Sequence, residues 1–153
     1  MTKPLETLEV TAQEALLKTP ALITILIAGS DGTIDEEELA AGTNLTRWKT
    51  INARPDLLAY YQLVDARFEN DVKELMAELP EDKIDRCQEL VKRISTNDEH
   101  LHRLPSVFAQ QLYSSWKELA KRIAEASGGV LGYLSIGYDE SKLVNLQMLT
   151  PPQ

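Results

Sequence analysis

The chain has 153 residues, of which 43% are apolar and 26% charged, and this composition predicts one globular domain over residues 1–153. Its formal net charge is −8, which argues against nucleic acid and against an anionic membrane surface as partners, because both need a basic protein face. The same charge suits cations, or a basic face on a partner protein.

The cysteine content and the N-terminus indicate the compartment. A single cysteine, Cys87, rules out an internal disulfide, and its apolar helical position predicts a buried, unreactive thiol. The N-terminus lacks the basic-then-apolar order of a secretory signal. The longest apolar run, ALITILIA, has about eight residues, whereas a helix needs roughly twenty to span a bilayer. We therefore expect a soluble, cytoplasmic protein with no direct membrane insertion.

Apolar side chains recur at helical spacing along most of the chain, and no stretch alternates convincingly as a strand would. In chain order the pattern predicts helices over residues 5–18, 20–29, 35–51, 56–79, 81–94, 105–126 and 139–149. The expected fold class is all-α: a single-domain bundle of about six or seven helices with short connections.

Two of these helices depend on prolines. Thr19-Pro20 has the pattern of an N-cap followed by proline at the first helical position, which predicts a new helix from residue 20. That helix is apolar all round and is therefore expected to be buried. Its β-branched residues would also suit a strand closed by an Asp31-Gly32 turn, but the EEELAA that follows does not alternate. Helix 56–79 is either continuous or kinked near Asn70, and Pro80 ends it.

A faint internal repeat relates a stretch in the first half of the chain to a stretch near its end. Each copy has an Ile-Ala pair, a loop containing glycine, an isoleucine and a glutamate four residues later. The copies are Ile27-Ala28, Ile34 and Glu38, and Ile123-Ala124, Ile136 and Glu140. The repeat predicts two pseudo-symmetric helix–loop–helix corners.

The first corner, IAGSDGTIDEEEL, is strongly acidic. It contains Asp31, Asp35, Glu36, Glu37 and Glu38, and no Lys or Arg occurs between Lys18 and Arg47. One interpretation is structural, because Asp35 and Glu38 have the spacing of a capping box, and acids in a first turn suit the helix dipole. The other is a cation site in which Asp31, Asp35 and Glu38 offer oxygen ligands to Ca²⁺, Mg²⁺ or Mn²⁺. The position of Glu36, where an EF-hand loop requires glycine, excludes that motif.

Other motifs predict little chemistry. SGGVLGYLSIGYDESK lacks the preceding strand and the GK[ST] of a phosphate loop. Asp98-Glu99-His100-Leu101-His102 has the residue types of a metal cluster. On a helix, however, His100 and His102 do not share a face, so we expect surface histidines. No Ser-His-Asp, Cys-His or HExxH arrangement appears in the sequence, so we expect no enzymatic activity.

The two acidic corners resemble the two signatures of the tellurite-resistance TerB-like family. The first signature corresponds to residues 27–38, and the second to IAEASGG from Ile123, followed by Gly132, Ile136 and Asp139-Glu140. The resemblance implies an all-α bundle with two pseudo-symmetric corners, a bound metal ion, and a place in bacterial stress or metal resistance. By position, the implied metal ligands are Asp31, Asp35, Glu38 and Glu140. Gly29-Ser30 departs from the alanine usual before Asp-Gly, and residues 43–102 match nothing in the family.

These observations lead to one expected function and one alternative. We expect a non-enzymatic, divalent-cation-linked binding or sensor module that acts with protein partners. The alternative is a helical protein-interaction module without metal, whose acids serve as helix caps and as a partner surface. A metal-dependent hydrolase ranks third: paired carboxylates suffice for such chemistry, but the sequence supplies no nucleophile with a base and an orienting group.

Overall fold

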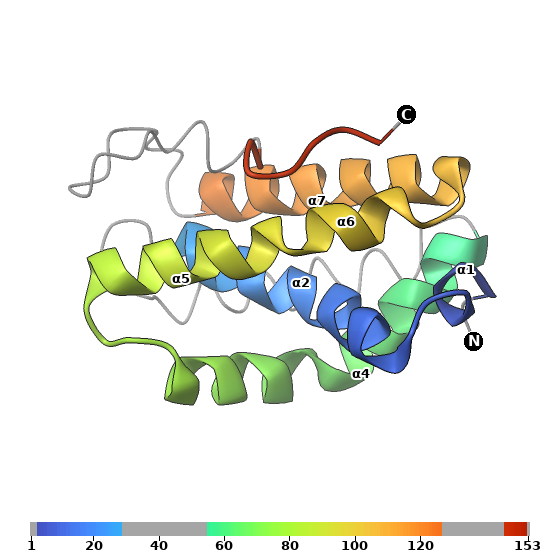
Figure 1. Cartoon of the computed structure of the whole chain (residues 1–153). Coiled ribbons are helices and arrows are strands. Elements are labelled where there is room, and N and C mark those ends of the chain that lie inside the picture. The colour runs from blue at the N-terminus through green and yellow to red at the C-terminus, as the bar shows by residue number, and fades with distance from the viewer. Residues whose placement is uncertain (1–2, 29–54, 127–145, 153) are drawn as a thin grey trace.

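The computed structural model describes residues 3–28, 55–126 and 146–152, and within these ranges it contains helices and no strand (Figure 1). The helices are α1 Lys3–Glu6, α2 Val10–Ala28, α4 Pro55–Glu78, α5 Lys83–Ser95, α6 Asn97–His102 and α7 Ser106–Ala126. The predicted all-α class is therefore confirmed, with four long helices (α2, α4, α5 and α7) in the described ranges. The total of six or seven helices and the two pseudo-symmetric corners depend on residues outside these ranges and stay predictions.

Helix α2 is the centre of the bundle. It packs against α4, α5, α6 and α7, and Figure 1 shows it between α4 on one side and α7 on the other. Every residue from 19 to 27 is buried, as the all-round apolar sequence predicts. Residues Val10–Ile27 are the one stretch among the described residues that is long and apolar enough to cross a membrane. Because 61% of this stretch is buried inside the protein, it has the character of a core helix, and core helices can be equally long and apolar.

The predicted helix boundary at Thr19-Pro20 is wrong, since α2 runs through Pro20 without ending. Proline has no N–H for the carbonyl of Leu16, and its ring pushes that carbonyl away from the helix. The Tyr60 hydroxyl on α4 donates to the Leu16 carbonyl at 2.6 Å, and Trp116 Nε1 on α7 donates to the Tyr60 oxygen at 3.2 Å. A side chain from another helix thus satisfies the carbonyl that proline leaves free, and α2 can continue.

The start of the chain also differs from the predicted helix over 5–18. Helix α1 ends at Glu6 and α2 begins at Val10. A turn separates them, in which the Leu8 N–H donates to the Leu5 carbonyl at 2.9 Å and the Gln13 side chain donates to the Leu8 carbonyl at 2.8 Å. The turn allows both Leu5 and Leu8 to be buried.

The remaining long helices follow the sequence closely. Helix α4 is one 24-residue helix, with an exposed Asn70 that donates to Glu74 at 3.0 Å and no break there. Helix α5 begins after an N-cap, Asp82, whose carboxylate accepts from the N–H groups of Ile84 and Asp85 at 3.1 and 3.0 Å. Helix α7 covers the predicted range to within one residue at its start.

Two features near the C-terminal end were not predicted. Helix α6 lies in a stretch to which the pattern assigned no helix. Residues 146–148 form a turn and not the end of a helix running to 149: Leu146 has a positive φ of 52°, and the Leu149 N–H donates to its carbonyl at 3.0 Å. Leu146 and Leu149 are both buried in the hydrophobic core.

Helices α2 and α4 are also joined by charge. Arg67 on α4 donates to Glu14 on α2 at 3.0 and 2.7 Å, and to Asp71 on α4 at 2.8 and 3.3 Å. Asp71 is only 2% exposed, so the guanidinium provides the positive charge that a buried carboxylate needs. Arg67 lowers the pKa of Glu14, chiefly through this hydrogen bond.

Candidate functional site at helix α6

The predicted metal ligands Asp31, Asp35, Glu38 and Glu140 all lie outside the described residues. The structure therefore neither brings them together nor separates them, and the cation site stays a prediction. Within the ranges that the structure describes, no group of three or more His, Cys, Asp or Glu residues is placed to hold a metal ion.

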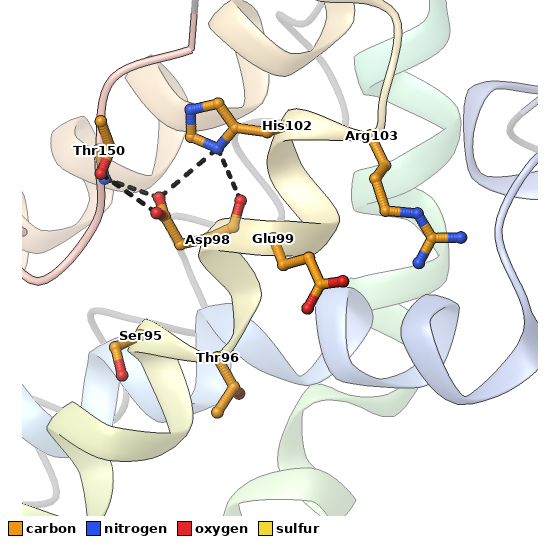
Figure 2. A pocket seen from close by; sticks show the side chains of 7 residues that line it. All are labelled: Ser95, Thr96, Asp98, Glu99, His102, Arg103 and Thr150. Carbon is orange, nitrogen blue, oxygen red and sulfur yellow. Dashed lines mark hydrogen bonds and ion pairs between the residues drawn. The ribbon is translucent and has the colours of Figure 1, made fainter.

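A cleft of about 700 Å³ lies beside α6, close to the turn that follows it. All of its lining side chains are polar or charged, and they come from the end of α5, from α6 and its two caps, and from the segment 146–152. They are Ser95, Thr96, Asp98, Glu99, His102, Arg103 and Thr150 (Figure 2). Figure 2 shows Thr150 and His102 next to Asp98, whereas Arg103 points away on the opposite side of the helix end.

Asp98 is the residue to which the other cleft groups connect. One carboxylate oxygen accepts from the Thr150 N–H at 2.7 Å, and the other accepts from the Thr150 hydroxyl at 3.1 Å. Hydrogen bonds to an ionised carboxylate are roughly twice as strong as neutral ones. Asp98 therefore holds Thr150, which is 52 residues away in sequence, by both the backbone and the side chain of the threonine.

His102 supports Asp98 from the next turn of α6. Its Nδ1 lies 2.7 Å from the Asp98 carbonyl oxygen and 3.6 Å from one carboxylate oxygen. A carbonyl oxygen only accepts, so Nδ1 carries the proton in this hydrogen bond. His102 thus fixes the backbone of Asp98 and places positive charge near its carboxylate whenever the imidazole is protonated.

The hydroxyl groups at the end of α5 are occupied by the backbone. Ser95 donates to the Lys92 carbonyl at 2.8 Å, and Thr96 donates to the Arg93 carbonyl at 2.6 Å. Such bonds satisfy carbonyls that the end of a helix leaves free. Ser95 is therefore not directed at His102 as a nucleophile would be at its base.

The far side of the cleft is an exposed ion pair. Arg103 donates to Glu9, just before α2, at 2.9 Å. This hydrogen bond, together with the charge of Arg103, lowers the pKa of Glu9. On α7, burial raises the pKa of Tyr113, and the negative charge of Asp98 raises it further.

Behind the cleft, α6 is fastened to the core through Asn97. Its side chain is 1% exposed, and its amide nitrogen donates to the Thr19 hydroxyl at 2.8 Å, next to Pro20. Thr19 in turn donates to the Ala15 carbonyl at 2.8 Å. The amide oxygen of Asn97 has no hydrogen-bond partner in the described part of the chain. Asn97 therefore fixes the position of α6 on α2, and with it the direction of Asp98.

Three ionisable groups of the cleft hold other groups of this chain. The Asp98 carboxylate holds Thr150, the His102 imidazole holds the Asp98 carbonyl, and the Arg103 guanidinium holds the Glu9 carboxylate. The one thiol in the chain is elsewhere: Cys87 on α5 is buried, as predicted, and burial raises its pKa to about 11. A thiol with such a pKa is a poor nucleophile at neutral pH.

Sequence reasoning missed this site, although one signal was present. Asp98 and His102 are four residues apart and share a helix face. The two histidines, His100 and His102, do not share a face, and their spacing therefore gives no sign of this site. The contact with Thr150 has no local signal, because nothing near Thr150 in sequence indicates which helix it meets.

Comparison of the chain with protein-family models, with curated proteins and with solved structures finds no match.

Proposed function

We propose that this chain is a non-enzymatic helical binding module whose binding is linked to a divalent cation. The ion would be held by Asp31, Asp35 and Glu38, with Glu140 contributed by the second predicted corner. The observation that carries the proposal is the run of five acids, without a single base, directly after α2. Crowded carboxylates repel each other unless a cation or a proton neutralises them.

The position of α2 supports this choice. Helix α2 ends at Ala28, three residues before Asp31, and its residues 19–27 are all buried. The acidic stretch therefore follows directly after a helix that is packed into the core.

The chemistry of the acids favours a hard cation. Carboxylate and carbonyl oxygens suit Ca²⁺, Mg²⁺ and Mn²⁺, whereas Zn²⁺ in structural sites usually has Cys or His ligands. The resemblance to the TerB-like family supports a role in bacterial stress or tellurite and metal resistance, with protein partners and a cytoplasmic location. Each of these assignments is part of the proposal.

Calorimetry on metal-free protein tests the proposal. We expect saturable heat with at least one of Ca²⁺, Mg²⁺ and Mn²⁺, and weaker binding by Asp35→Asn. Because Asn caps a helix as well as Asp does, this substitution should leave the metal-free melting temperature about unchanged. Glu81→Gln, which removes an exposed acid outside the corner, is the matched control and should bind as the parent does.

Two outcomes would contradict the proposal. The first is no heat and no change in melting temperature with millimolar amounts of any of the three ions. The second is identical titrations for Asp35→Asn and the parent, which would make Asp35 a helix cap. The first outcome favours the alternative of a helical interaction module without metal, and the second removes Asp35 from the proposed ligands.

A further inference from the structure

Residues 146–152 contact the rest of the protein as a short bound peptide would. We infer that α6 and the adjoining core form a recognition site for peptides with a Leu-x-x-Leu-Thr pattern. In this chain the site is occupied by its own residues 146–152, which act as an internal competitor. The partner is therefore a protein segment that presents two leucines three residues apart, followed directly by a hydroxyl side chain.

The two leucines supply the apolar part of recognition. Leu146 is 0% and Leu149 4% exposed, and both belong to the hydrophobic core, whereas Gln147 between them is exposed. The turn closed by the Leu149 N–H and the Leu146 carbonyl brings both side chains to the same side of the segment. Burial of apolar surface is the main favourable contribution to most protein association, so the two leucines are the expected anchors of a bound peptide.

The carboxylate of Asp98 supplies direction and selectivity. It accepts one bond from a backbone N–H, which every residue except proline offers, and one from a hydroxyl, which selects Thr or Ser. The two hydrogen bonds act together because they use the two oxygens of one carboxylate. His102 holds the helix turn that carries this carboxylate. A peptide with valine in place of threonine fits the same space and loses one of the two bonds.

The surroundings leave room for a longer ligand. Thr150 lines the open cleft beside α6, and Pro151 after it is exposed. Figure 1 shows the segment in red, with the C-terminal end on the outside of the bundle. A partner chain can therefore continue past the threonine without a clash with the core.

The chain's own segment sets the strength of competition. It is joined to α7 by residues 127–145, a stretch of 19 residues that contains four of the seven glycines. The segment belongs to the same chain, so it competes within one molecule with any peptide from outside. An outside peptide is therefore opposed by a tethered copy, and weakening the internal segment should strengthen outside binding.

The experiment measures binding of a fluorescent, end-capped peptide with the sequence of residues 146–152 to full-length protein in EDTA. We expect the Thr150→Val chain to bind this peptide about tenfold more tightly than the parent, because its own segment has lost a bond to an ionised carboxylate. Thr150 is exposed, so this variant keeps the fold, which circular dichroism and the melting temperature verify.

Two further arms test the pattern itself. The double variant Thr150→Val/Asp98→Asn should bind the peptide about tenfold more weakly than Thr150→Val alone, since the amide offers only one acceptor oxygen. A peptide with valine at the threonine position should bind the Thr150→Val chain about tenfold more weakly than the parent peptide does. Equal binding by the folded parent and Thr150→Val chains, or equal binding of the two peptides, would overturn the inference. EDTA keeps these outcomes separate from those of the cation proposal.

Discussion

At the scale of single residues, the most informative group is the Tyr60 hydroxyl. It lies fully buried between α2, α4 and α7, where it donates to the Leu16 carbonyl and accepts from Trp116. Burial raises the pKa of Tyr60, so the hydroxyl keeps the proton that it donates. The Tyr60 hydroxyl therefore satisfies two buried groups. One is the Leu16 carbonyl, which Pro20 leaves without its helical donor, and the other is the Trp116 indole N–H, which needs an acceptor.

This arrangement predicts that the cost of removing the hydroxyl depends on Pro20. Tyr60→Phe should lower the free energy of unfolding by about 1–3 kcal/mol, because a buried donor and a buried acceptor lose their partner. In a Pro20→Ala background the same substitution should cost about 1 kcal/mol less, since the N–H of residue 20 can then reach the Leu16 carbonyl. Urea unfolding of the four proteins measures the difference, and strictly additive effects would contradict this account.

At the scale of helices, local signals predicted most of what forms. Helices α4, α5 and α7 have the ranges that their apolar spacing, their prolines and the acids before α5 indicate. Two of the errors fall where a distant group decides the outcome. Helix α2 crosses Pro20 because of Tyr60 on α4, and α6 depends on Asn97 contacting Thr19, 78 residues away. Neither contact has a signal within a local window of sequence.

The cap of α5 is a local signal that can be tested directly. Asp82→Ala should lower the free energy of unfolding by about 1 kcal/mol, because two N–H groups at the start of the helix lose their acceptor. Asp82→Asn should be nearly silent, as asparagine caps equally well. Thermal unfolding of the two variants distinguishes the cap from a general effect of charge. If only the charge of Asp82 mattered, both variants would shift the melting temperature equally.

At the scale of the whole molecule, the sequence predicted the fold class but not the site. The composition, the negative charge and the helical spacing suffice for an all-α chain, because each is a property summed over many residues. The cleft beside α6 depends on Asp98 and Thr150, which are 52 residues apart in sequence and meet only after folding. The predicted carboxylate site at Asp31, Asp35, Glu38 and Glu140 lies outside the described residues and awaits the cation titration.

The ion pairs that tie distant parts together predict how the whole protein responds to acid. Arg67 lowers the pKa of Glu14 below its ordinary value of 4.5, so the ionised carboxylate stabilises the folded state above that value. The contribution is lost as the pH falls through the lowered pKa. Because Glu14 is about half exposed, the contribution stays below about 1 kcal/mol at neutral pH.

Glu14→Gln should therefore be less stable than the parent near neutral pH, and the difference should vanish in acid. Urea unfolding at a series of pH values from about 7 to about 3 measures this convergence. Glu69→Gln, an exposed glutamate on α4, is the control and should show a much smaller pH-dependent difference. A difference between Glu14→Gln and the parent that is the same at every pH would contradict the ion-pair explanation.

The proline inside α2 also has an evolutionary consequence. A descendant that replaces Pro20 regains a backbone donor, and selection on the hydroxyl at position 60 then relaxes with respect to the Leu16 carbonyl. The reverse order, in which the hydroxyl is lost first, leaves that carbonyl unpaired and is disfavoured. Proline at position 20 should therefore be accompanied by tyrosine at position 60, whereas another residue at position 20 leaves the Trp116 indole as the one of these two buried groups that still needs the hydroxyl. Sequences descended from this chain should show this pairing of proline with tyrosine.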